Sequence, residues 1–256
     1  MQSRDPSVVA IIQARMGSSR LPGKVLKEIC GKPMLVHQVM RVRRAATIGQ
    51  VVVATTFNPE DDQIAQVCRD FSIPYFRGNP HDVLDRYYRT AGLFHAQTIV
   101  RLTGDCPVID PKMIDWTVQS YFEAKVDFAA NRLPPPWNRT TPIGMDTEVV
   151  SFDNLALAWC EAEKKHEREH VMPYFYQQEG RFKVLLLQHE PDLSHYRLTV
   201  DTPEDLDLIR QIFKYFGCSN EFSLDDMIAL LEQRPDLVAL NAQVIHKDYQ
   251  EIDPRS

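Results

Sequence analysis

The amino-acid sequence predicts an α/β fold built on a doubly wound, mostly parallel sheet. Short runs rich in valine and isoleucine alternate along the chain with longer segments of helical spacing. The clearest runs, at residues 8–12, 51–55 and 98–102, are continuously apolar rather than alternating. Strands buried on both faces have this pattern. The β-α-β-α order favours right-handed crossovers, with helices on both faces of the sheet.

Several of the expected helices begin at a capping signal. Asn58 precedes a proline, Asp82 has an acidic residue three positions later, and Thr202 is followed by Pro203 and Asp205. The expected helices are residues 34–44, 60–70, 83–95, 111–123, 153–165, about 169–178, 203–216 and 223–234. The later expected strands are 147–150, 183–187 and 197–200, so that Asp201 would end a strand just before a helix.

The alternation stops between Asp127 and Val150, where residues 134–137 are Pro-Pro-Pro-Trp. We predict a single domain over residues 1–256, with an inserted arm at 127–150 and a C-terminal helix and tail at 218–256. A chain of 256 residues buries enough surface to fold without a metal or disulfide.

Composition excludes several classes of protein. The net charge is −6, and the longest basic cluster is Arg41 to Arg44, which argues against non-specific nucleic-acid binding. No stretch approaches the 18 apolar residues of a membrane span. The five cysteines are far apart, with no C-x-x-C pair, so we expect reduced thiols and a cytoplasmic location.

The most informative segment is the loop of residues 13–25, which directly follows the first expected strand. It contains two glycines, two serines and the cations Arg15, Arg20 and Lys24. Ligands of open α/β sheets bind at the carboxyl ends of strands, where a glycine-containing loop can cradle phosphate oxygens. We expect Arg15 and Lys24 to be exposed loop cations that neutralise phosphates. A solvated turn is the alternative.

This loop is neither a P-loop nor a Rossmann glycine motif. Five residues separate Gly17 from Gly23 where a P-loop has four, and Val25 replaces the serine or threonine that would hold magnesium.

Two aspartates are candidates for a metal site. Asp105 follows the strand at 98–102, and Asp201 follows the one expected at 197–200, so both belong at the ligand-binding edge. Mg²⁺ prefers a few carboxylates together with water and phosphate oxygens. The alternative is that Asp105 is a turn residue and Asp201 a helix cap.

The segment Ala14-Arg15-x-Gly17-Ser18-x-Arg20-Leu21-Pro22-Gly23-Lys24 resembles the N-terminal signature of the cytidylyltransferases that make CMP-activated acidic sugars. The match is best to their spore-coat-polysaccharide (SpsF-like) branch. Further matches follow in the family's order at residues 83–87, 101–107, 144–148, 168–171 and 199–206. The resemblance covers about residues 8–241. It implies a Rossmann-like nucleotidyltransferase sheet of the glycosyltransferase-A type.

The resemblance also implies roles for particular residues. Arg15 and Lys24 would be catalytic, and Asp105 and Asp201 would bind the catalytic Mg²⁺. The acceptor would contact Asp146, Glu148 and His170. The nucleotide would be bound by Ala14, Arg15, Gly17, Ser18, Arg20, Gly23, Lys24 and Arg86.

The implied activity is transfer of CMP from CTP to an acidic sugar or related acceptor, with release of pyrophosphate, in surface-polysaccharide biosynthesis. Relatives commonly dimerise. We therefore expect a homodimer formed through the inserted arm, because its apolar side chains would otherwise be exposed to solvent. These are Leu133, Trp137, Ile143 and Met145. The alternative is a loop folded back over its own sheet.

Three other functions remain open. A glycosyltransferase of similar fold would consume a nucleotide-sugar, and a non-catalytic module would bind a nucleotide without turnover. The sequence His166-Glu167-Arg168-Glu169-His170 matches the H-E-x-x-H pattern of zinc metalloproteases. That segment is charged almost throughout and is followed by Pro173, so a solvated helix face is the more ordinary interpretation.

Overall fold

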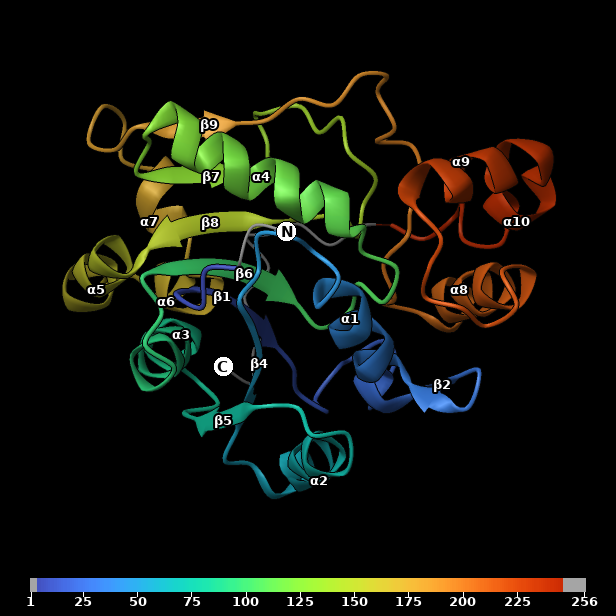
Figure 1. Cartoon of the computed structure of the whole chain (residues 1–256), viewed down its shortest axis with the longest axis horizontal. Coiled ribbons are helices and arrows are strands. Elements are labelled where there is room, and N and C mark those ends of the chain that lie inside the picture. Colours follow the sequence, from blue (N-terminus) through green and yellow to red (C-terminus); the bar gives the residue numbers. More distant parts are fainter. Residues whose placement is uncertain (1–3, 246–256) are drawn as a thin grey trace.

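A seven-stranded sheet forms the middle of the molecule, which a computed structural model describes over residues 4–245 (Figure 1). The strand order is β5-β4-β1-β6-β8-β7-β9. The strands are β1 (Val8–Gln13), β4 (Gln50–Thr56), β5 (Tyr75–Gly78), β6 (Thr98–Thr103), β7 (Phe128–Ala130), β8 (Glu148–Ser151) and β9 (Val184–Leu186). Strands β5, β4, β1 and β6 run parallel, and β8 is antiparallel to both β6 and β7. The predicted mostly parallel sheet is confirmed.

Alternate residues of β1 pack into two separate cores, one on each face of the sheet. Ala10 and Ile12 lie in the first core, and Val9 and Ile11 lie in the second. This explains the continuous apolar runs, because both faces of the parallel strands are covered. The first core is covered by α1 (Met34–Val42), α2 (Asp62–Asp70), α4 (Pro111–Ala124), α8 (Pro203–Tyr215), α9 (Leu224–Gln233) and α10 (Pro235–Ala239). The second is covered by α3 (Val83–Leu93), α5 (Phe152–Glu161) and α7 (Pro173–Tyr176), with α6 (Lys165–His170) beside them.

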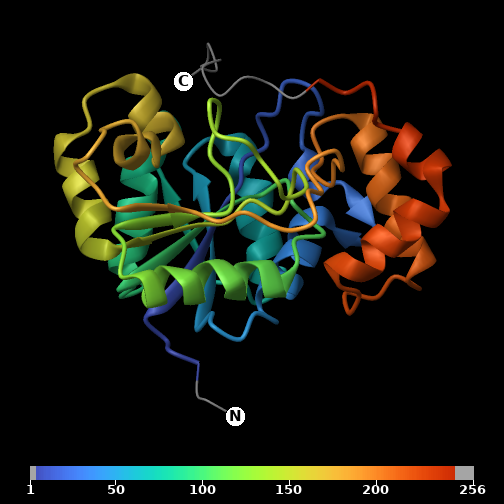
Figure 2. The same ribbon diagram turned by 90° about the horizontal axis from the view of Figure 1, so that it is seen from above.

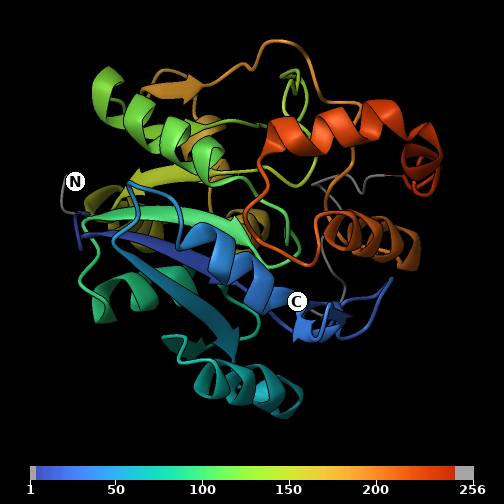
Figure 3. The same ribbon diagram turned by 45° about the vertical axis from the view of Figure 1, so that its right-hand side comes forward.

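Two groups of helices, one from each core, lie at opposite ends of the molecule. Figure 2 shows the gold helices α5–α7 at one end and the orange and red helices α8–α10 at the other. Two short elements follow the β1 loop: a 3₁₀ turn η1 (Lys24–Leu26) and a hairpin of β2 (Glu28–Ile29) and β3 (Lys32–Pro33). The hairpin lies beside α8 (Figure 1, Figure 3).

Two of the three predicted caps are confirmed. Asp82 accepts a hydrogen bond from the Asp85 N–H at 2.9 Å, and Thr202 forms a capping box with Asp205. Asn58 does occupy an N-cap position with Pro59 directly after it, but it precedes the 3₁₀ turn η2 (Pro59–Asp61) rather than α2, and its side chain makes no capping hydrogen bond.

Other expected elements differ in the structure. Residues 197–200 form no strand of the sheet, and only an isolated bridge joins Ile143 to Arg197. The helix expected at about 169–178 is divided into α6 and α7, since Val171 adopts a φ of 69° and Pro173 starts a new turn. Strands β5 and β7 and the helix α10 were not expected. The predicted polar tail from Lys247 lies outside the described residues.

The inserted arm is largely folded onto its own domain. Residues 128–130 of the arm form β7 and residues 148–150 lie in β8, and Leu133 and Met145 are both buried. Its tip, residues 135–138, is exposed, and Trp137 is 39% exposed. The apolar surface expected to drive dimerisation is therefore mostly covered within one chain, and the homodimer stays a prediction.

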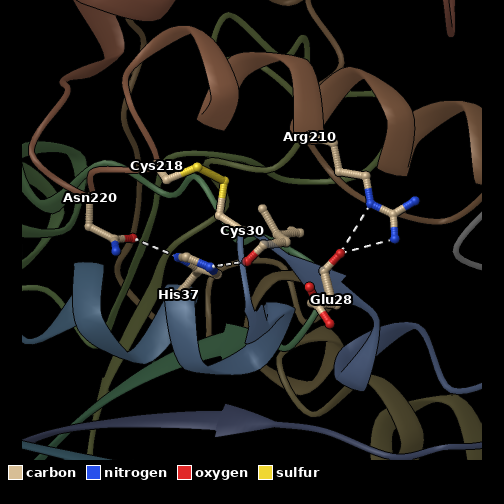
Figure 4. The surroundings of a disulfide bond; sticks show 7 residues. Glu28, Cys30, His37, Arg210, Cys218 and Asn220 are labelled. Atoms are coloured by element: carbon tan, nitrogen blue, oxygen red, sulfur yellow. Dashed lines mark hydrogen bonds between the residues drawn. A yellow bond between two sulfur atoms is a disulfide. The ribbon is translucent and has the colours of Figure 1, made fainter.

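The expectation that all cysteines are reduced is wrong for Cys30 and Cys218, which form a disulfide (Figure 4). They are 188 residues apart in sequence, and their Cα atoms are 5.8 Å apart. The same two segments are joined by His37, whose ring nitrogens hydrogen-bond Ile29 O at 2.7 Å and Asn220 Oδ1 at 3.2 Å. The cysteines thus no longer support a reducing compartment, and the cytoplasmic location stays a prediction. Across residues 4–245, no helix has the length and apolar character needed to cross a membrane.

Candidate active site

The loop after β1 lies where the strand order reverses. From β1 the chain proceeds to β4 and β5 on one side, and β6 lies on the other side. In open α/β sheets, the crevice at this point binds ligands. Gly104 N–H donates to Gln13 O at 2.8 Å, and a Cβ on Gly104 would lie only 2.7 Å from that oxygen. Glycine therefore allows the turn that carries Asp105 to approach the β1 loop.

Lys24 is the centre of a compact group of charges. Its Nζ lies 3.0 Å from Asp105 Oδ2 and 2.8 Å from Asp201 Oδ1, and it donates to Val200 O at 2.8 Å. Its side chain is only 12% exposed, so the expectation of an exposed loop cation is wrong for Lys24. Burial lowers the pKa of Lys24, but the two carboxylates outweigh this and raise it. The ammonium is therefore charged at neutral pH.

Asp201 is surrounded by cations. Arg20 Nη2 lies 3.0 Å and Arg197 Nη2 lies 2.7 Å from Asp201 Oδ2. Burial raises the pKa of the Asp201 carboxyl, but Lys24, Arg20 and Arg197 together hold it well below its usual range. Asp201 is therefore ionised throughout the physiological pH range.

The two aspartates fit a divalent cation only in part. Their carboxylates converge on one point, since both contact the same nitrogen of Lys24, and they are the hard oxygen ligands that Mg²⁺ prefers. Among the described residues, no group of three or more His, Cys, Asp or Glu side chains has the arrangement of a complete metal site. Asp105 and Asp201 would thus hold Mg²⁺ together with phosphate oxygens and water.

A cavity of about 190 Å³ lies next to the β1 loop. Its walls include four of the predicted site residues, Ala14, Arg15, Arg86 and His170. Arg86 Nε and His170 Nε2 are buried and make no hydrogen bond with the described residues. Burial and the charge of Arg101 lower the pKa of His170, so its imidazole is neutral at pH 7. The cavity is thus lined by polar residues, and one buried nitrogen in each of two of them has no partner among the described residues.

The cavity brings together residues that the sequence assigned to different substrates. His170 was expected at the acceptor, yet it shares this cavity with the nucleotide-binding candidates. The other nucleotide candidates lie on the same loop and are partly exposed: Gly17, Ser18, Arg20, Gly23 and Lys24.

The two acidic acceptor candidates are both paired with arginines. Asp146 Oδ2 accepts from Arg139 Nη2 at 2.8 Å, and Glu148 forms an ion pair with Arg101 across β6 and β8. Arg101 also donates to Gln13 Oε1 at 3.2 Å, and Gln13 lines the cavity. Glu148 is therefore connected, through Arg101, to Gln13 in the cavity wall.

The geometry gives no support to the zinc metalloprotease alternative or to a catalytic role for the Cys106 thiol. His166 Nε2 hydrogen-bonds Gln177 Oε1 at 2.8 Å, Glu167 pairs with Lys164, and His170 lines the separate cavity. Burial, together with Asp105 and Asp146, raises the pKa of Cys106 well above its usual value. Its thiol is therefore protonated at neutral pH.

Sequence reasoning missed Arg197 as part of this site. Arg197 lies four residues before Asp201, just as Arg101 lies four residues before Asp105. The two segments have similar sequences, R-L-T-V-D and R-L-T-G-D. Although 197–200 is not a strand, Val200 N–H donates to Asp105 O at 2.8 Å. This contact, rather than a strand pairing, brings the two aspartates together.

A sheet of this order, with a cationic loop facing two aspartates at the switch point, has the architecture of a nucleotidyltransferase. The cytidylyltransferase family model matches residues 9–242. The chain belongs to this family, and the resemblance of its motifs to SpsF-like CMP-sugar synthetases is confirmed. It is a nucleotidyltransferase enzyme.

Individual relatives support this assignment. The spore coat polysaccharide biosynthesis protein SpsF of Bacillus subtilis (strain 168) is 32% identical over 236 residues, which cover 90% of this chain and 95% of SpsF. A cytidylyltransferase structure from Leptospira borgpetersenii serovar Hardjo-bovis (strain JB197) matches with a TM-score of 0.85 and 34% identity, over 94% of this chain and 99% of that one. The structure of CMP:2-keto-3-deoxy-manno-octonic acid synthetase complexed with CTP has a TM-score of 0.62 at 21% identity, over 81% of this chain and 98% of that one, and so shares the fold.

Proposed function

We propose that this enzyme transfers CMP from CTP to an acidic sugar or related acceptor in surface-glycan biosynthesis, with Mg²⁺ as cofactor and pyrophosphate as the second product. The observation that carries the proposal is the convergence of Lys24, Asp105 and Asp201 at the end of the β1 loop whose first residues, Ala14 and Arg15, line the cavity. Cations and metal-binding carboxylates at one point are what the transfer of a charged phosphoryl group requires.

In the proposed reaction, an oxygen of the acceptor attacks the α-phosphorus of CTP in line. The bond from the α-phosphorus to the bridging oxygen breaks, and pyrophosphate leaves with the electron pair. Arg15, Arg20 and Lys24 neutralise the triphosphate, and Asp105 and Asp201 would hold Mg²⁺. When bound, the metal ion stabilises the charge that develops on phosphate oxygens. The attacking oxygen belongs to a hydroxyl, whose proton is lost to solvent as the new bond forms, or to an ionised phosphate or phosphonate group, which carries no proton.

The cavity at residues 14–15 and 86 is proposed to accept the nucleotide, and His170 contributes to the same wall. Asp146, held by Arg139, and Glu148, held by Arg101, are proposed to orient the acceptor. Because each carboxylate is paired, its position is defined before any substrate binds.

The test is an assay of pyrophosphate release from each of the four NTPs with Mg²⁺, over a panel of nonulosonic acids and sugar phosphates. We expect release only with CTP and with at least one acidic acceptor. A glycosyltransferase would consume a nucleotide-sugar and release no pyrophosphate from CTP, and a non-catalytic module would bind CTP without turnover. Either result would refute the proposed function.

We also propose a homodimer, through the exposed tip of the arm. Trp137 is 39% exposed there and lies edge-on to Tyr176, with ring centroids 5.7 Å apart. Sedimentation at micromolar concentration tests this, because a single species near 29.5 kDa would show a monomer.

A further inference from the structure

A buried carboxylate, Asp61, contacts the β1 loop from the neighbouring strand connection. Asp61 is the last residue of η2, between β4 and α2, and it is 0% exposed. Its Oδ1 accepts from the Met16 N–H at 2.7 Å, and its Oδ2 accepts from the Thr56 hydroxyl. A buried carboxylate is costly unless hydrogen bonds satisfy it, so these two contacts fix its position.

Met16, the residue that Asp61 holds, is where the loop closes on itself. The carbonyl of Met16 accepts from Ser18 N–H at 2.8 Å and from Gly23 N–H at 2.9 Å. Its N–H and its C=O are thus both engaged: the first is held by Asp61, and the second joins the two ends of the loop. Arg15 and Gly17 flank Met16, and Lys24 follows Gly23 directly.

The connection that carries Asp61 is itself braced. Arg77 of β5 donates to Thr56 O at 2.8 Å and to Asn58 O at 3.1 Å, and the Asn58 N–H donates to Thr56 Oγ1 at 3.1 Å. A Cβ added at Gly17 would lie 3.3 Å from Glu60 Oε1, so the loop packs closely against η2. A rigid support on β4 and β5 is thereby coupled to the loop on β1.

We propose that Asp61 is a positioning residue for nucleotide binding, which acts by fixing the Met16 peptide and, through it, the loop of residues 15–24. This inference rests on the proposed function of the loop in binding CTP. Asp61 touches no reacting atom in the proposed mechanism. Its carboxylate replaces the water that would otherwise hydrogen-bond the Met16 N–H, so the loop is ordered before the nucleotide arrives.

The neighbouring Asp62 provides a matched control. Its side chain is 65% exposed and pairs with Arg77 at 2.6 Å, and no contact to the β1 loop is found for it among the described residues. The same change at the two positions therefore separates loop positioning from a general loss of negative charge.

The experiment combines CTP titration without acceptor, steady-state kinetics and hydrogen exchange of peptides spanning residues 14–24. Asp61→Ala is expected to weaken CTP binding about tenfold, to raise the KM for CTP with little change in kcat, and to speed loop exchange. Asp61→Asn, which keeps one acceptor for the Met16 N–H, should recover part of the affinity. Asp62→Ala and Asp62→Asn should stay within about twofold of wild type in every measurement.

Thr56→Val keeps the proposal testable if Asp61→Ala does not fold. It removes the hydroxyl that donates to Asp61 and accepts from the Asn58 N–H, while keeping a β-branched side chain, and should shift CTP affinity and loop exchange in the same direction by a smaller amount. A folded variant at Asp61 with wild-type CTP affinity and wild-type loop exchange overturns the proposal, even if its melting temperature falls.

The failure of the proposed function would be seen separately. If the wild-type protein neither binds nor turns over CTP, the proposed function is wrong. The exchange measurement needs no nucleotide, so faster exchange in Asp61→Ala would still show that Asp61 holds the loop, and unchanged exchange would refute it.

Discussion

Lys24→Met removes the cation that joins the two metal-binding candidates. The change keeps most of the apolar stem of the side chain and deletes the ammonium, whose Nζ lies 3.0 Å from Asp105 and 2.8 Å from Asp201. All three side chains are largely buried, with 12%, 24% and 15% of their surface exposed. The variant therefore leaves a buried negative charge without its partner.

The magnitude follows from what remains around each carboxylate. Removing one partner of a buried ion pair costs about 3–5 kcal/mol. Asp201 keeps Arg20 and Arg197, whereas Asp105 has no second ion-pair partner within residues 4–245. We therefore expect the free energy of unfolding to fall by about 2–3 kcal/mol, just below that range, because Asp201 keeps two arginines and the site is not fully buried. For a chain of this size, this lowers Tm by about 4–12 °C.

The pH dependence of this loss has a defined sign. The pKa of Lys24 is raised, so its contribution is complete below about pH 10 and is lost at higher pH. The pKa of Asp201 is lowered, so its contribution is complete above about pH 4 and is lost as the pH falls further. The difference in the free energy of unfolding between wild type and variant should be constant between about pH 5 and pH 9. It should decrease below and above that pH range.

Thermal melts and pyrophosphate-release kinetics measure the two effects, with Lys27→Met as the control. Lys27 is exposed and lies three residues further along the chain, so its variant should stay within about 0.5 kcal/mol of wild type. Lys24→Met should also lose about 10²–10³ in kcat, the usual cost of removing a group that stabilises transition-state charge. Wild-type stability and turnover in Lys24→Met would refute both the ion-pair and the phosphate roles.

Asp105→Asn and Asp201→Asn should each nearly abolish magnesium-dependent turnover because the amide loses the charge that holds the ion; more than about a tenth of wild-type activity in either would show that its metal role is wrong. Arg15→Ala should raise the KM for CTP about tenfold with kcat nearly unchanged, because Arg15 is exposed and lines the cavity. An unchanged KM would show that Arg15 does not contact the nucleotide. The double variant Cys30→Ser/Cys218→Ser should unfold about 2–5 kcal/mol more easily, because the cross-link spans 188 residues. If the denaturation curves of the wild type and the double variant coincide, the two cysteines are unpaired in solution.

Much of the fold was predictable because its signals are local. Continuous apolar runs at β1, β4 and β6 indicated parallel strands buried on both faces, and the capping residues Asp82 and Thr202 marked the starts of α3 and α8. Strand β7 was harder to predict, since it has only three residues and its partners are β8 and β9. So brief a strand has little pattern of its own, and its pairing is stabilised by neighbours distant in sequence.

The sequence alone determined that a cationic, glycine-containing loop follows the first strand and that Asp105 follows another, because strand ends are local features. Only the tertiary structure decided what these residues contact. Lys24 is 81 residues from Asp105 and 177 from Asp201, and Asp61 is 45 residues from Met16. A buried charge takes whichever opposite charge or hydrogen-bonding group the packed chain brings within reach, and no local spacing records that choice. For the same reason Lys24 proved to be a buried ion-pair partner, and Cys30 and Cys218 proved to be joined.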